Sequence, residues 1–189
     1  MNSDMKYERY EALIAHPNKQ LTGFMRQFLR DKGFGTIIQS TGSRDAVKRL
    51  KRDKTRLLIV DYDLPDFGGA DFGGADFVKF VRICEGPLSE AAVCIVISKP
   101  NRQKVLAARD AGANEVFALP LTLNSAERKI TRALEDPAPF IRVPTYTGPC
   151  RRRTSLEDWG GDDRRGTISK VGSPKVIGIS KILSASGQQ

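Results

Sequence analysis

The stretch RLLIVDYDLP, residues 56–65, decides the fold of this chain. Four apolar residues in a row, some of them β-branched, end abruptly at the carboxylate of Asp61. A continuous apolar run of this length is typical of a strand buried on both faces, as in a parallel sheet. Open α/β sheets hold their ligands at the carboxyl ends of such strands. The stretch therefore predicts a central strand with Asp61 at a ligand-binding edge.

Strand-like and helix-like patterns alternate on either side of this segment. Apolar runs predict strands at 11–15, 36–38, 56–61, 93–97 and 116–119. Apolar residues with helical spacing lie between them, most clearly over 21–29. Right-handed crossovers then give an α/β fold, a flavodoxin-like doubly wound sheet of five parallel strands in the order 2-1-3-4-5. In that order the residues that follow strands one and three, His16 and Asp61, are neighbours.

Small polar residues mark the expected helix starts, and glycines mark two helix ends. Ser43, Asp76 and Asn124 are the expected caps of the second, third and fifth helices. Gly33 and Gly112 follow the first and fourth helices, where a left-handed residue ends a helix.

The composition is that of one ordinary domain with an extension. The chain has 189 residues, 40% of them apolar, and a net charge of +9 with a pI near 9.7. Residues 1–10 form a polar lead-in, 11–135 the domain, and 136–189 a tail rich in Pro, Gly and Arg that is expected to be disordered. The three cysteines have no metal-like spacing, and no apolar run is long enough to span a membrane. A cytoplasmic location is expected.

The central segment resembles the phosphoacceptor strand of bacterial response regulator receiver domains. Asp61, Leu64, Pro65 and Gly69 match the pattern of that family. The resemblance covers 11–134 and implies that Asp61 accepts a phosphoryl group with the help of Mg²⁺, which Asp61 and Asp63 would hold. It also implies that Ser98, after the fourth strand, contacts the phosphoryl group. Pro120 matches a family proline whose preceding peptide bond is often cis.

Other positions depart from the family. The acidic pair that holds the metal is replaced by His16 and Pro17, and the lysine expected before Pro120 is Leu119. The aromatic switch position is Val116, with Phe117 one place out of register. Without a counter-charge, a negative group about 4 Å from Asp61 costs about 4 kcal/mol at an effective dielectric of 20. That is roughly a thousandfold in rate.

These departures favour a stand-alone, degenerate receiver that acts through protein contacts, with weak or absent phosphorylation of Asp61. Its partners would be a histidine kinase or a downstream signalling protein. The length leaves no room for a DNA-binding effector domain, and no enzymatic activity is expected. One alternative is an ordinary receiver phosphorylated on Asp61. A remote alternative is a phosphatase of the haloacid dehalogenase type, with Asp61 as nucleophile and Asp63 as general acid. A pH-sensing pair of His16 and Asp61 also stays open.

Two repeats complete the sequence. The five residues DFGGA at 66–70 recur at 71–75, which is either a tolerated loop insertion or a Gly-rich flap over Asp61. In the tail, a glycine and two further residues precede an arginine cluster twice, giving Arg151 and Arg152, then Arg164 and Arg165. These arginines are either solvated or bind a protein or anionic surface.

Overall fold

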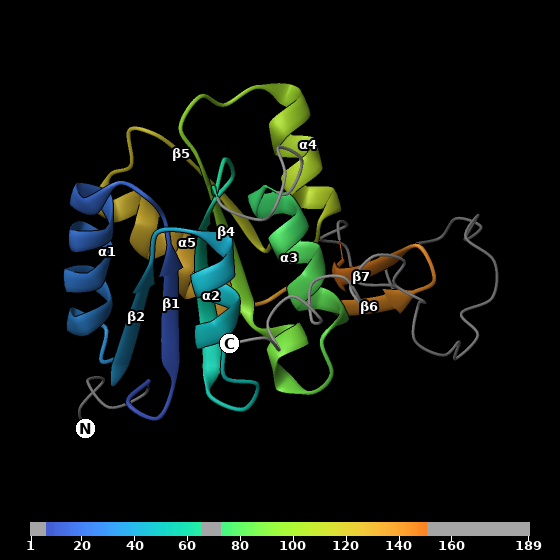
Figure 1. Ribbon diagram of the computed structural model, residues 1–189, viewed down its shortest axis with the longest axis horizontal. Helices are drawn as coiled ribbons and strands as arrows, with labels where there is room; N and C mark the ends of the chain where they lie inside the picture. Colours follow the sequence, from blue (N-terminus) through green and yellow to red (C-terminus); the bar gives the residue numbers. More distant parts are fainter. Residues whose placement is uncertain (1–6, 66–72, 151–189) are drawn as a thin grey trace, which may run out of the picture.

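Five parallel strands form one sheet in the order β2-β1-β3-β4-β5, as the sequence predicts. The structure, a computed structural model, describes residues 7–65 and 73–150 (Figure 1). The strands of this sheet are β1 (Glu11–Ala15), β2 (Thr36–Ser40), β3 (Thr55–Asp61), β4 (Ala92–Ile97) and β5 (Glu115–Ala118).

Helices cover both faces of the sheet and bury two apolar layers. The helical segments are α1 (Lys19–Asp31), α2 (Ser43–Arg49), α3 (Gly74–Ile83), the 3-10 turn η2 (Pro87–Glu90), α4 (Arg102–Asp110) and α5 (Leu123–Glu135). Residues of α1 and α5 pack on one face, and residues of α2, α3 and α4 pack on the other (Figure 1). Because both faces are covered, Leu57 to Val60 in β3 are completely buried, which explains the unbroken apolar run.

Strand register brings the functional positions to one edge. Ala15 pairs with Val60, so His16 and Asp61 follow at the same level of the sheet. Asp61 pairs with Val96 in β4, and Ser98 comes two residues later. The carboxyl ends of β1, β3 and β4 therefore converge, as a parallel sheet requires.

Three expected helix caps are wrong. Helix α2 begins after Gly42, and the hydroxyl of Ser43 donates instead to the carbonyl of Pro65 at 3.2 Å. Helix α3 begins after Gly73, three residues before the expected cap, so Asp76 lies in its first turn. Helix α5 is capped by Thr122, whose hydroxyl accepts from the backbone N–H of Ser125. Each error displaces the helix start by three residues or fewer, and the caps of α2 and α3 are glycines that make no side-chain hydrogen bond.

The expected disorder from residue 136 onward is wrong for residues 140–149. Two strands, β6 (Phe140–Val143) and β7 (Tyr146–Pro149), pair there as an antiparallel hairpin. In Figure 1 the hairpin lies beside α3, on the side of the molecule away from α1. A two-stranded hairpin is marginal alone, so packing against the domain must stabilise it. The expected arginine clusters at Arg151, Arg152, Arg164 and Arg165 lie outside the described residues.

A buried arginine organises the surface on which the hairpin docks. Arg82 of α3 is only 1% exposed. Its guanidinium lies 5.5 Å from the ring of Phe140 in β6. It donates to four acceptors: the carbonyls of Ser89, Ala91 and Gly112 and the side-chain oxygen of Asn114, at 2.7–2.8 Å. Burial lowers the pKa of Arg82 to about 10, which leaves it charged at neutral pH.

Part of the polar lead-in is also packed. The ring of Tyr7 stacks on Phe34 at 5.0 Å, and its hydroxyl donates to Glu135 at the end of α5 at 2.5 Å. Gly35 is required here, since a Cβ atom would lie 2.1 Å from the carbonyl oxygen of Glu8. Within the described residues, none of the helices has the length and apolar character needed to cross a membrane.

Candidate functional site

Asp61 is a buried carboxylate at the end of β3. It is 5% exposed, and its Oδ1 accepts a long hydrogen bond of 3.4 Å from the backbone N–H of Asp63. The start of α3 closes one side of the crevice, where the N–H of Gly74 donates to the carbonyl of Tyr62 at 2.8 Å. A Cβ atom at residue 74 would lie 1.9 Å from the carbonyl oxygen of Asp61, so this approach requires glycine.

His16 faces Asp61 from the end of β1. Its Nδ1 accepts from the backbone N–H of Asn18 at 3.0 Å, which assigns the proton of the neutral ring to Nε2. That Nε2 lies 3.9 Å from Oδ1 of Asp61, beyond hydrogen-bonding distance. It is buried and has no hydrogen-bond partner among the described residues. The position that would hold metal ligands in a receiver thus carries a nitrogen donor.

Burial shifts the two groups in opposite directions. It lowers the pKa of His16, because the charged ring is poorly solvated, and the negative charge of Asp61 offsets only part of this effect. Burial likewise raises the pKa of Asp61, and the charge of His16 opposes that shift. The pair therefore favours its neutral forms more strongly than either residue would in water.

Lys104 of α4 forms an ion pair with Asp63, the second carboxylate at this edge. Nζ of Lys104 donates to both oxygens of Asp63, at 2.8 and 2.7 Å. The same ammonium group lies 5.0 Å from the ring of Tyr62. Its positive charge also lowers the pKa of Asp61, although less than burial raises it. No sequence pattern marks Lys104 as a site residue, because only the packing of α4 on the sheet brings its side chain to Asp63.

The donors at this edge do not fit Mg²⁺. Magnesium prefers near-octahedral oxygen ligands. Asp61 supplies one carboxylate, whereas Asp63 is held by Lys104, His16 presents an N–H, and Pro17 has no side-chain donor. Within 7–65 and 73–150, no cluster of three or more His, Cys, Asp or Glu residues is arranged to hold a metal ion.

The positions that would contact a phosphoryl group lie on the neighbouring strands. Ser98 is exposed and follows directly after β4. Leu119 follows β5, and its N–H donates to the carbonyl of Ile97 at 3.2 Å. Its side chain packs against the apolar layer of α1 and α5. The peptide bond between Leu119 and Pro120 is cis, as expected. An apolar side chain thus stands where the family has its lysine.

The side chains of Val116 and Phe117, the two residues considered for the aromatic switch position, point to opposite faces of the sheet. Val116 is half-buried and packs against the layer of α2, α3 and α4. Phe117 is fully buried in the layer of α1 and α5 on the other face. Because successive side chains of a strand point to opposite faces, Phe117 does not replace an aromatic residue at position 116. Phe117 is therefore a core-packing residue.

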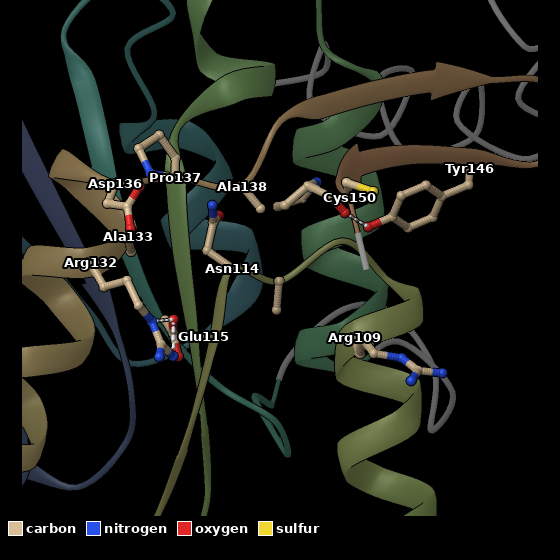
Figure 2. Close-up of a pocket in the computed structure, with 12 residues that line it drawn as sticks. Arg109, Asn114, Glu115, Arg132, Ala133, Asp136, Pro137, Ala138, Tyr146 and Cys150 are labelled. Atoms are coloured by element: carbon tan, nitrogen blue, oxygen red, sulfur yellow. Dashed lines mark hydrogen bonds and ion pairs between the residues drawn. The ribbon is translucent and has the colours of Figure 1, made fainter. Parts of the chain in front are cut away.

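Part of the DFGGA repeat lies outside the described residues, since 66–72 are not among them. A separate hollow of about 200 Å³ lies where the hairpin meets the ends of α4 and α5 (Figure 2). Arg132 lines it and forms an ion pair with Glu115, as the dashed lines in Figure 2 mark. The hydroxyl of Tyr146 donates to the carbonyl of Pro149 at 2.7 Å. These polar groups stabilise the hairpin junction and are remote from Asp61 in the sheet.

Comparisons with known proteins agree with this architecture. No protein-family model matches the chain. The chain is 23% identical over 135 residues to chemotaxis protein CheY-3 of Vibrio cholerae, a match that spans 71% of this chain and 95% of the relative.

Solved structures with the same fold have low sequence identity. A CheY-like response regulator receiver domain protein from Methanospirillum hungatei superposes with a TM-score of 0.58 at 15% identity, over 67% of this chain and 94% of that one. A putative response regulator from Chloroflexus aurantiacus gives 0.56 at 20% identity, over 66% and 97%. Vibrio cholerae CheY4 gives 0.56 at 17% identity, over 66% and 98%. The match covers about two thirds of the chain, while the relatives are covered almost completely.

Proposed function

Because the part of this chain from β1 to α5 has the fold of a response regulator receiver domain, we propose that it is a signalling protein that acts through protein contacts with weak or absent phosphorylation of Asp61. The observation that carries this proposal is the buried N–H of His16 facing Asp61. A receiver needs metal-binding carboxylates at that place.

Two further features support the same proposal. Leu119 offers no positive charge to an incoming phosphoryl group. The raised pKa of Asp61 means that burial already opposes its negative charge, so converting the singly charged carboxylate into a doubly charged acyl phosphate is costly. Without a metal, and with Lys104 held by Asp63, the cost of about 4 kcal/mol for one charge at about 4 Å stays largely uncompensated.

Beryllofluoride with Mg²⁺ tests the proposal, because it forms a stable mimic of the phosphorylated aspartate. We expect no Asp61 adduct by NMR with the natural sequence at concentrations that saturate ordinary receivers. The variant His16→Asp/Pro17→Asp/Leu119→Lys restores three family positions and should form the adduct. Adding Asp61→Asn to that variant is the matched control and should abolish it. Tight adduct formation by the natural sequence would contradict the proposal.

An ordinary phosphorylated receiver is the second candidate, and Lys104 is the observation that favours it. Its ammonium group is close enough to lower the pKa of Asp61 and could replace the missing lysine if it left Asp63. Mass spectrometry after incubation with acetyl phosphate and Mg²⁺ distinguishes the candidates. Under this alternative, Asp61 gains a phosphoryl group and Lys104→Gln reduces the rate by about tenfold or more.

We also propose that the chain is not a phosphatase of the haloacid dehalogenase type. In that mechanism Asp63 would donate a proton to a leaving group, but both of its oxygens already accept hydrogen bonds from Lys104. Mg²⁺-dependent phosphatase turnover that disappears in Asp63→Asn would overturn this view. A cytoplasmic location, and a histidine kinase or downstream signalling protein as partner, are further parts of the proposal.

A further inference from the structure

A groove of about 400 Å³, lined mainly by residues with polar end groups, opens between α1 and the turn after β2. It lies on the β2 side of β1, whereas Asp61 lies on the β3 side, and His16 lines the wall between them. The residues that line the groove are His16, Lys19, Thr22, Gly23, Arg26, Gln39, Ser40, Thr41 and Asp45. Such a hollow has the size of a small-molecule site, but its lining calls for a polar ligand.

One wall of the groove is a face of α1 on which two cationic residues flank a glycine. Lys19, Gly23 and Arg26 are spaced by four and three residues, so they lie on one face of the helix. Glycine is unfavourable inside a helix. No packing contact requires it here, since a Cβ atom at Gly23 would have no atom within 4 Å. The missing side chain leaves space between two cations.

The charge of the groove is positive. Lys19 and Arg26 are exposed, and neither has an ion-pair partner among the described residues. Asp45, the acidic residue of the wall, is already compensated, because Nε of Arg49 donates to both of its oxygens at 2.7 and 2.8 Å. That contact holds the pKa of Asp45 below its usual value.

The opposite wall is formed by the end of β2 and its turn. Gln39 spans the groove base, with its side-chain amide donating to the carbonyl of Thr22 at 3.3 Å. The hydroxyl of Ser40 donates to Gly42 at 2.8 Å and is therefore already engaged. Thr41 is exposed at the rim. The groove thus has the exposed cations Lys19 and Arg26 on one wall. Its polar side chains Gln39 and Ser40 are fixed by hydrogen bonds within the protein.

We propose that this groove binds a small phosphate monoester, with Arg26 and Lys19 holding the phosphate and the space beside Gly23 receiving its polar substituent. Arginine forms paired hydrogen bonds with phosphate oxygens, and lysine adds a point charge. The proposal does not depend on the fate of Asp61. His16 lines the groove, while its Nε2 faces Asp61 on the other side.

Titration of the full-length chain with phenyl phosphate, in the absence of Mg²⁺, tests the site. We expect saturable shifts of the Gly23 and Thr41 amide signals in two-dimensional NMR spectra, and tighter binding than for inorganic phosphate. Lys19→Gln and Arg26→Gln should each weaken binding about tenfold or more, whereas Arg128→Gln, which removes the same charge from α5, should leave it unchanged.

Gly23→Leu provides a steric test that leaves the fold intact, because its side chain enters open space. We expect this variant to keep its α1 signals and to lose binding of phenyl phosphate. Asp61→Asn should bind as the natural sequence does, so the outcome is independent of phosphorylation.

Three outcomes would overturn the proposal. The first is no saturable binding of either probe. The second is binding that Lys19→Gln, Arg26→Gln and Gly23→Leu leave unchanged, which means an adventitious ion only. The third is markedly tighter binding of a phosphoserine peptide, or of vesicles containing phosphatidic acid, than of phenyl phosphate, which would assign the groove to a modified protein or a membrane instead.

Discussion

The buried imidazole of His16 determines the polar surroundings of Asp61. Nε2 of His16 carries a proton, has no partner among the described residues, and lies 3.9 Å from Asp61. Leaving such a donor unpaired costs roughly 1–3 kcal/mol. Burial lowers the pKa of His16 and raises the pKa of Asp61, so both shifts act against the larger cost of two buried charges.

The titration of His16 is therefore measurable and has a definite sign. The chain has one histidine, so its ring signals in NMR spectra are unambiguous. We expect a pKa below the ordinary value of about 6.5, because burial disfavours the charged ring. Asp61→Asn should lower it further, since the aspartate charge is what raises it. An unchanged pKa in Asp61→Asn would show that the two groups are not coupled.

The same shift makes stability depend on pH. Unfolded His16 takes up a proton as the pH falls through about 6.5, while the folded form resists doing so. The free energy of unfolding should thus decrease between pH 7 and pH 5. The raised pKa of Asp61 acts in the opposite direction at lower pH. Urea unfolding of His16→Gln should lack the decrease between pH 7 and pH 5, and an unaltered pH profile in this variant would contradict the assignment.

Two glycines with opposite surroundings provide a matched comparison. Gly74→Ala places a Cβ atom 1.9 Å from the carbonyl oxygen of Asp61, so we expect a loss of about 3 kcal/mol or more in the free energy of unfolding. Gly23→Ala has free space and should increase that free energy by about 0.5–1 kcal/mol. Urea unfolding measures both. Equal effects in the two variants would contradict the close packing of α3 against β3.

Among the elements, the hairpin of β6 and β7 depends on a side chain of α3. Arg82 holds three backbone carbonyls and Asn114 while its guanidinium faces Phe140. We expect Arg82→Met to lower the free energy of unfolding by about 3 kcal/mol or more, because buried carbonyls lose their donors.

Arg142 is the control for that experiment. It also lies against Phe140, at 5.1 Å, but its side chain is 52% exposed and its ion pair with Glu90 faces solvent. Arg142→Gln should therefore cost no more than about 1 kcal/mol. A similar cost for both variants would mean that burial of Arg82 does not set the stability of this region.

At the level of the whole molecule, the domain ends later than its composition suggests. Ending the chain after Asp136 removes the hairpin and should lower the free energy of unfolding by about 2 kcal/mol, through loss of the contacts of Phe140 with Arg82 and of Arg142 with Ser89. Ending it after Cys150 keeps every described contact of the hairpin and should change that free energy by less than about 0.5 kcal/mol. Equal stability of the two truncated chains would contradict a docked hairpin.

The parallel sheet was predictable because each strand is marked by the apolar residues of its own segment. Strands buried on both faces need unbroken apolar runs, and the alternation of such runs with amphipathic segments limits the topology to few choices. Strand order then predicts that His16 and Asp61 meet, which the structure confirms at 3.9 Å. The replacement of receiver residues by His16, Pro17 and Leu119 is likewise visible in the sequence.

The sequence by itself therefore determined the architecture and the positions gathered at its carboxyl edge. Only the tertiary structure decided that Lys104 holds Asp63, that the proton of neutral His16 points at Asp61, and that Arg82 docks a hairpin where disorder was expected. Each of these depends on side chains from segments distant in the sequence. Apolar periodicity predicts which face of a helix or strand is buried. It does not predict which polar side chains from distant segments contact that element.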